Sequence, residues 1–145
     1  MRLTGLVVSL LCVVSFGVRA QAPSPVGVWR TFDDQTGLER GAVRISERSG
    51  ELIGVIVRVL DPKDADKICI FCSDERKDKR ILGLTIITGM RLDGESWSGG
   101  RILDPENGSI YRSSMRLVDN GRTLIVRGYV GISLLGRSQT WRRAE

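Results

Sequence analysis

Two cysteines three residues apart are the residues whose type and spacing most directly suggest chemistry. Cys69 and Cys72 form a single C-x-x-C motif. This spacing suits a disulfide, a pair of redox-active thiols, or two of the four ligands of a structural zinc ion. The chain has no histidine, and its other cysteine lies near the N-terminus. We therefore expect no metal site and interpret the pair as a disulfide.

The absence of histidine restricts the catalytic chemistry of the whole chain. It excludes Ser-His-Asp and Cys-His nucleophilic sites and the HExxH zinc motif. Acid–base catalysis would fall to carboxylates in predicted turns, namely Asp33, Asp34, Asp104 and Glu106. In turns, such side chains more commonly hydrogen-bond to the local backbone. A binding protein is therefore favoured over an enzyme, and no cofactor is expected.

Polar and aromatic side chains near the C-terminus form a candidate ligand site. Arg137, Gln139 and Trp141 alternate along the chain, so they share one face of a regular strand. Pointing into a barrel, that face would supply converging donors beside an aromatic ring; pointing outward, it would meet water. The full set of candidate ligand-binding residues is Tyr111, Arg127, Tyr129, Arg137, Gln139 and Trp141.

The elements that must position these residues are short strands separated by turns. We expect strands over 27–32, 42–47, 52–60, 84–91, 95–103, 109–118 and 122–130, followed by a final strand run. Asp93-Gly94 and Asn120-Gly121 are strong hairpin signals. The apolar stretch 127–141 cannot remain an open edge, and the run 27–32 is its natural partner. The sequence thus predicts an all-β fold, an antiparallel up-and-down β-barrel of about eight strands.

The stretch 61–80 interrupts this strand pattern. It is heavily charged and contains the C-x-x-C motif. Loops of this length are commonly lids or binding loops. We expect it to cover an internal cavity that binds a small amphipathic molecule, because aromatic residues make up only 6% of the chain and small residues recur on its strands. The alternative is a barrel filled by Leu, Ile and Val side chains.

A glycine pair interrupts one of the expected strands. Gly99-Gly100 predicts a β-bulge, which changes the alternation of side chains by one residue. Trp97 and Ile102 would then share a face despite their odd separation. The alternative is a flexible turn at the same position.

The first 20 residues have the character of a signal peptide. Arg2 precedes an apolar run at 6–18, which is shorter than the ~20 residues of a membrane-spanning helix. We expect cleavage after Ala20, which leaves residues 21–145 as a single domain without an integral membrane segment. The protein would then be periplasmic or secreted, where a disulfide persists.

The charge of the predicted mature chain is mild. Without Arg2 and Arg19, 20 basic residues remain against 17 acidic ones, a net charge of +3. The basic residues are spread along the strands and do not cluster in the sequence. We therefore predict no nucleic-acid partner, while the oligomeric state is left open.

A set of motifs extends over nearly the whole predicted mature chain. They are GVW at 27–29, DDxTG at 33–37, the C-x-x-C loop, GRILDPENG at 100–108, RGYxG at 127–131 and LGRxQxW at 135–141. Together they resemble a family of exported bacterial proteins catalogued as domain of unknown function 2147. The resemblance implies a lipocalin-like β-barrel without an established activity.

The first of these motifs is also similar to the Gly-x-Trp that opens the first strand of lipocalins. That resemblance implies that Trp29 packs against a basic residue near the end of the barrel, a cation–π contact. We expect Trp29 to be buried at the closed end beneath an arginine of the last two strands, with Arg127, Arg137 or Arg142 as the candidates.

Two functions from different classes follow. The first is an exported barrel that binds a small amphipathic molecule. The second is a thiol redox factor or another enzyme that acts through Cys69 and Cys72 or through the loop carboxylates.

Overall fold

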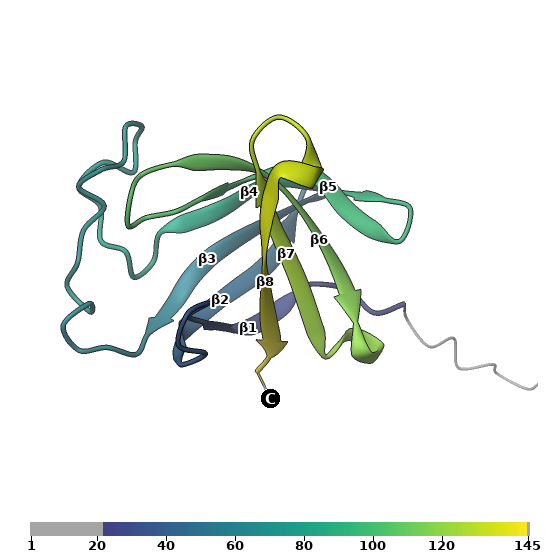
Figure 1. Ribbon diagram of the computed structural model, residues 1–145, viewed down its shortest axis with the longest axis horizontal. Coiled ribbons are helices and arrows are strands. Elements are labelled where there is room, and N and C mark those ends of the chain that lie inside the picture. Colours follow the sequence, from purple (N-terminus) through teal and green to yellow (C-terminus); the bar gives the residue numbers. More distant parts are fainter. Residues whose placement is uncertain (1–21, 145) are drawn as a thin grey trace, which may run out of the picture.

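The computed structural model describes residues 22–144, which form a closed barrel of eight antiparallel strands (Figure 1). The strands are β1 (Gly27–Phe32), β2 (Glu39–Arg48), β3 (Glu51–Val59), β4 (Thr85–Asp93), β5 (Ser96–Leu103), β6 (Ile110–Val118), β7 (Thr123–Tyr129) and β8 (Gly136–Arg143). Short 3-10 turns, η1 (Asp119–Gly121) and η2 (Ser133–Leu135), precede β7 and β8. The predicted signal peptide and its cleavage site lie outside the described residues.

The barrel has up-and-down topology, because each strand pairs with its neighbour in sequence and β8 returns to β1. At this junction Trp29 lies opposite Arg143, and Arg30 lies opposite Arg142. The predicted fold class and the predicted pairing of the first and last strands are both confirmed. Strand alternation places the tight β2–β3, β4–β5 and β6–β7 turns at one end of the barrel, here called the closed end. The loops 33–38, 60–84, 104–109 and 130–135 lie at the other, here called the open end.

The strands curve into a barrel with the help of bulges. The register between β5 and β6 shifts between Trp97 and Gly100, so Trp97 lies opposite Met115 and Ile102 lies opposite Tyr111. The predicted bulge at Gly99-Gly100 is thereby confirmed. Gly100 also has to be glycine for space, because a Cβ atom there would lie 2.6 Å from the side chain of Met90.

The closed half of the barrel is filled with side chains. The largest fully buried ones are Trp29, Trp141, Ile45, Ile87, Met90, Met115, Leu124 and Val126. They come from every part of the sequence and form one hydrophobic cluster. This packing favours, for the closed half, the alternative in which Leu, Ile and Val fill the interior, with two tryptophans and two methionines among them.

Trp29 anchors the closed end, as expected. Its side chain is fully buried, and its Nε1 donates a hydrogen bond of 2.7 Å to the carbonyl oxygen of Pro25. The guanidinium that covers the ring is that of Arg143, 4.3 Å from the ring centroid. The prediction of an arginine from the last two strands is confirmed, but the three named candidates were wrong. Arg143 occupies the place because directly paired residues of antiparallel strands point to the same face.

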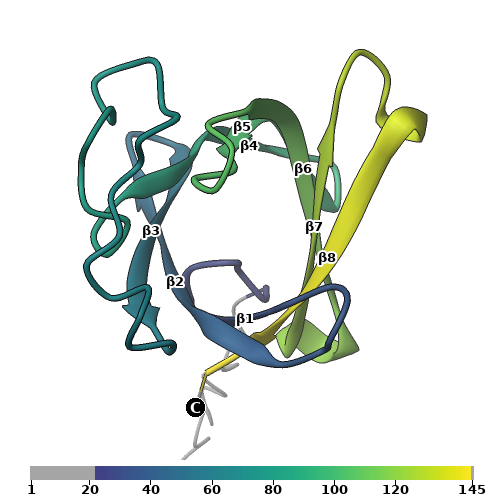
Figure 2. The ribbon, with the colours of Figure 1, turned by 60° about the vertical axis from the view of Figure 1, so that its left-hand side comes forward.

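The hydrophobic cluster extends to the outer wall beneath the long β3–β4 loop. Ile87 lies opposite Ile102 inside the barrel, so the adjacent Ile86 and Leu103 point outward. Both are nevertheless buried, and they share a cluster with Leu84 and the two cysteines of the loop. The loop therefore covers the outer face of β4 and β5. Figure 2 shows it beside the ring of strands rather than across that ring, so the prediction of a lid over the open end was wrong.

Candidate ligand site at the open end

The inner face of β8 carries three of the six predicted site residues. Trp141 is 1% exposed within the core cluster, so Gln139 and Arg137, two and four residues before it, also point inward. Leu124, Val126 and Gly128 of β7 lie opposite Trp141, Gln139 and Arg137, respectively. The inward orientation of this face, which alternation alone left open, is settled by the burial of Trp141.

A chain of polar contacts runs along this face from the core to the open end. Trp141 Nε1 donates to Gln139 Oε1 at 3.0 Å, and Gln139 Nε2 donates to Asp34 Oδ2 at 3.3 Å. The same carboxylate oxygen forms an ion pair with Arg137. The Arg137 side chain is 71% exposed and that of Asp34 24%. The chain therefore ends in a cation that solvent reaches.

Asp34 was not among the predicted ligand-site residues. It can reach β8 because the neighbouring Asp33 forms the hydrogen bonds of the turn. Asp33 Oδ1 accepts hydrogen bonds from the backbone N–H groups of Thr36 at 2.8 Å and Gln35 at 3.0 Å. The bonds from Thr36, backbone first, hold the pKa of Asp33 below its usual value. Asp33 is thus the turn former that the sequence predicted, and this turn leaves Asp34 to reach β8.

Small residues and one aromatic ring flank this polar chain. Tyr111 lies on the inward-facing side of β6 with the buried Ser113 and Met115. A Cβ atom at Gly128 would lie 3.4 Å from Ile102 and 3.5 Å from Tyr111, so glycine lets these side chains pack against β7. The Ser113 hydroxyl donates to the carbonyl oxygen of Arg127 at 2.9 Å. Tyr111 and Ile102 thus form an apolar wall near Arg137.

Arg127 and Tyr129 do not join these residues. They lie opposite Ser138 and Gly136, which alternate with Arg137 and therefore face the outside. The Arg127 guanidinium donates to the carbonyl oxygens of Ser133 at 2.6 Å and Leu134 at 3.3 Å. The structure thus places Tyr111, Arg137, Gln139 and Trp141 on one inner surface and the other two predicted residues on the outer wall.

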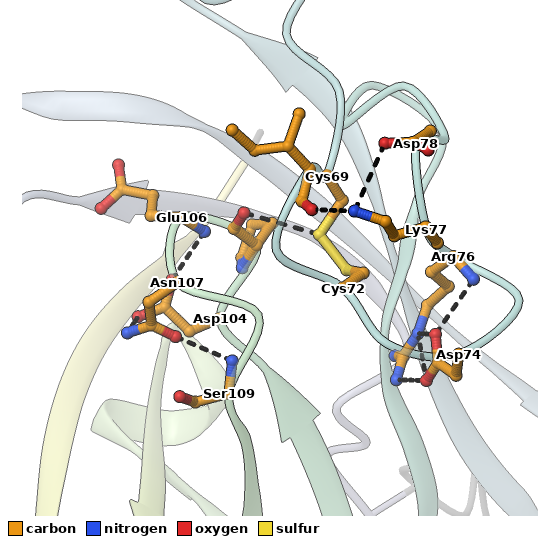
Figure 3. Close-up of a disulfide and its surroundings, with 12 residues drawn as sticks. Cys69, Cys72, Asp74, Arg76, Lys77, Asp78, Asp104, Glu106, Asn107 and Ser109 are labelled. Atoms are coloured by element: carbon orange, nitrogen blue, oxygen red, sulfur yellow. Dashed lines mark hydrogen bonds and ion pairs between the residues drawn. A yellow bond between two sulfur atoms is a disulfide. The ribbon is translucent and has the colours of Figure 1, made fainter.

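The predicted disulfide between Cys69 and Cys72 is present, with a sulfur–sulfur distance of 1.97 Å. Both cysteines are buried, with 0% and 2% of their surface exposed. The Cys69 Sγ atom lies 3.5 Å from the carbonyl oxygen of Pro105 in the β5–β6 loop (Figure 3). Gly108 permits this approach, because a Cβ atom there would lie 2.0 Å from the carbonyl oxygen of Phe71. The disulfide thus closes a turn within the β3–β4 loop, and that turn packs against the β5–β6 loop.

An ion pair fixes the other side of the same loop. Arg76 Nε donates to both carboxylate oxygens of Asp74, at 3.0 and 3.1 Å, and its Nη1 donates to the carbonyl oxygen of Thr85 at 3.1 Å (Figure 3). The hydrogen bonds from Arg76 lower the pKa of Asp74 to about 2. Asp74 and Arg76 therefore tie the loop to the start of β4.

The remaining loop carboxylates have partners within the protein. Asp104 accepts hydrogen bonds from the Glu106 backbone at 2.9 Å and from Asn107 Nδ2 at 3.0 Å, and Glu106 pairs with Arg40. Within residues 22–144, no three His, Cys, Asp or Glu side chains come together as a metal site would require. These acids therefore shape turns, as predicted for residues of this type.

Two hollows of the described chain lie outside the barrel. One separates the β3–β4 loop from β4, and the other lies between β1, β7 and β8 near the closed end. Neither enters the interior, and the predicted internal cavity stays a prediction. Among residues 22–144 there is no helix of the length and apolar character that crossing a membrane requires.

Comparisons with known proteins agree with this architecture. A family model described as "Uncharacterized protein conserved in bacteria (DUF2147)" matches residues 27–143. Among solved structures, the chain is similar to protein HP1028 from Helicobacter pylori, which is described as belonging to the lipocalin family. The identity is 17%, the TM-score is 0.73, and 84% of each chain is covered, so the likeness concerns the fold. No curated protein matches the chain.

Proposed function

This chain belongs to the bacterial family DUF2147, whose members are described as uncharacterised, and we propose from its own site that it is an exported binding protein for a small amphipathic molecule with an anionic head. The lipocalin-like fold is compatible with this role, because barrels of eight strands hold either one small ligand or only side chains. The proposed site is the inner surface of the open end, formed by Asp34, Tyr111, Arg137 and Gln139.

The observation that carries the proposal is the solvent-reached guanidinium of Arg137 at the end of the polar chain. Arginine presents a planar set of donors that suits a carboxylate or phosphate. Asp34 pairs with this guanidinium, and this ion pair supports the proposal that Arg137 accepts an anionic group. Tyr111 and Ile102, packed near Gly128, would contact the apolar part of the ligand.

Export is supported by the signal-like first 20 residues and by the disulfide. A disulfide persists in oxidising compartments, and we place the protein in the periplasm or outside the cell. Fractionation of the native host, followed by mass determination of the mature N-terminus, tests this. Protein that stays in the cytoplasm with its first 20 residues attached would contradict it.

The competing redox function is weakly supported by the geometry. Thiol–disulfide exchange needs a sulfur that an attacking thiolate can reach. Both cysteines are buried against the β5–β6 loop and the outer face of β4 and β5. We therefore assign the disulfide a structural role.

The experiment is a titration with C12 amphiphiles that share a tail and differ in the head: an anionic carboxylate, a zwitterion and a neutral glycoside. Intrinsic fluorescence reports binding, because Trp141 is hydrogen-bonded to Gln139 within the site. We expect the carboxylate to bind most tightly and Arg137→Gln to weaken it at least tenfold, the change that a lost charge-assisted hydrogen bond gives. Arg116→Gln, on the outer wall of β6, is the matched control. Failure of all three amphiphiles to bind would overturn the proposal.

A further inference from the structure

The loop between β7 and β8 exposes an unusual concentration of aliphatic side chains. Val130, Ile132, Leu134 and Leu135 are 67%, 60%, 83% and 73% exposed. The segment 130–135 is here called the tip, and Figures 1 and 2 show it, in yellow-green, projecting beyond the neighbouring strand ends. Single exposed aliphatic residues are ordinary, whereas four within six residues mark a surface that is covered in function.

The backbone of the tip is held from beneath. Arg127 donates to the carbonyl oxygens of Ser133 and Leu134, and the Leu135 N–H donates to the carbonyl oxygen of Ile132 at 3.1 Å. These bonds satisfy polar groups that would otherwise need water. A loop whose carbonyl groups already have donors enters an apolar medium at lower cost.

Arginines lie directly beneath the tip on the outer wall. Arg112 is opposite Tyr129, the last residue of β7, and Arg101 is directly opposite Arg112. Neither Arg101 nor Arg112 forms an ion pair within residues 22–144. Like charges in direct cross-strand positions destabilise a sheet unless an anion lies near them. Arg101 and Arg112 are apart in the sequence and come together through strand pairing.

We propose that the tip inserts into a membrane that contains anionic phospholipids, with Arg101, Arg112 and Arg127 at the level of the headgroups. The charge complementarity is direct: the tip itself carries no charge, and the arginines below it face phosphate oxygens. Tyr129 lies between Arg127 and the tip along β7, at the depth where aromatic residues favour the interface. A second copy of this chain fits less well, because its own arginines would face these.

This inference does not depend on a ligand in the barrel. It adds an orientation, because the tip belongs to the open end. Membrane binding would hold the proposed site of Arg137 and Asp34 close to the lipid surface. The two proposals are separable, since vesicle binding and amphiphile binding are measured with different variants.

The test is co-sedimentation of the purified protein with vesicles of phosphatidylglycerol and phosphatidylethanolamine, compared with vesicles of phosphatidylcholine alone. We expect binding to the anionic vesicles that weakens with added salt. The double variant Leu134→Ser, Leu135→Ser should bind at least tenfold more weakly, because each leucine loses its apolar contact. Leu92→Ser at the closed end, where the native side chain is 66% exposed, should bind as the native protein does.

The arginines are tested in the same assay. Arg101→Gln and Arg112→Gln should each weaken binding to anionic vesicles about fivefold, the usual effect of one basic residue near a charged surface. Arg44→Gln, on the outer face of β2, is the charge-matched control. Absence of binding to anionic vesicles, or equal binding by the tip double variant, would overturn the proposal. Self-association that the same double variant abolishes would overturn it too, because the occupant would then be a second copy.

Discussion

Replacing Arg143 by methionine should destabilise the barrel more than any other change of an arginine at its closed end. The guanidinium donates to the carbonyl oxygens of Ser24, Val26 and Gly121 at 2.7, 2.9 and 2.8 Å, and it lies over the Trp29 ring. Burial lowers the pKa of Arg143, because desolvation disfavours the charged form of the guanidinium.

The magnitude follows from those contacts. Three hydrogen bonds of a partly exposed charged group contribute about 1 kcal/mol each, and the cation–π contact contributes about 1 kcal/mol more. Methionine recovers part of this, because it keeps apolar contact with Trp29 and removes the desolvation cost. We expect a net loss of about 3 kcal/mol in the free energy of unfolding, a large share of the 5–15 kcal/mol of a typical domain.

Urea unfolding followed by tryptophan fluorescence measures this difference. The control is Arg142→Met, because the adjacent guanidinium is exposed and lies 5.6 Å from the centroid of the Phe32 ring. Its loss should cost less than about 1 kcal/mol. Equal effects of the two variants would refute the reasoning, as would a cost below about 1 kcal/mol for Arg143→Met.

Three further predictions concern the β3–β4 and β5–β6 loops at the open end. The thiols of Cys69 and Cys72 should resist alkylation until a reductant is added, and replacing both by alanine should cost about 2 kcal/mol, as closure of a four-residue loop predicts; quantitative labelling without reductant would show that the bond is absent. Gly108→Ala should loosen the contact with Phe71, because its φ of 74° and the nearby carbonyl leave no room for a Cβ atom; limited proteolysis of the loop measures this, and an unchanged nicking rate would contradict it. The contribution of Asp74 to stability should be complete above about pH 5 and should be lost progressively as the pH falls through about 2, because its pKa is lowered on folding. The difference between an Asp74→Asn variant and the native protein in urea unfolding should therefore be much smaller at pH 2 than at pH 6, and an equal difference at the two pH values would argue against this role.

Much of the fold could be predicted because its determinants are local. Turn residues such as Asp93-Gly94 mark hairpins by their own backbone preferences, and the bulge at Gly99-Gly100 follows from glycine in a strand. These features need no knowledge of residues distant in the sequence. Closure was predicted from the apolar stretch 127–141, and the barrel is closed. The premise was wrong, because the aliphatic residues of that stretch lie in the exposed tip and β8 itself is mostly polar.

The candidate site was harder to predict, because it depends on which face of each strand points into the barrel, and the turns between strands set this. Alternation placed Arg137 and Trp141 together, but the inward direction depends on packing by other strands. The β7–β8 loop sets β7 against β8 so that Arg127 lies outside, and its length does not reveal this register. Asp34 contacts a residue 103 positions away, so no local pattern identifies it. The expectation that the long loop covers the cavity failed for the same reason. Its packing against Ile86 and Leu103 is a tertiary contact, which no local pattern identifies.

The junction between β1 and β8 has a consequence for how the barrel opens. These strands share only two register positions, at Trp29 and Arg30, both toward the closed end. Toward the open end, side chains take the place of the backbone ladder, since Asp34 reaches across to Arg137 and Gln139. Among the strand junctions of the barrel, amide hydrogen exchange should therefore be fastest in the half of the β1–β8 junction that lies toward the open end. An anion that competes with Asp34 for Arg137 would loosen the same junction, so the barrel can widen by local unfolding at its mouth while the core around Trp29 and Trp141 stays closed.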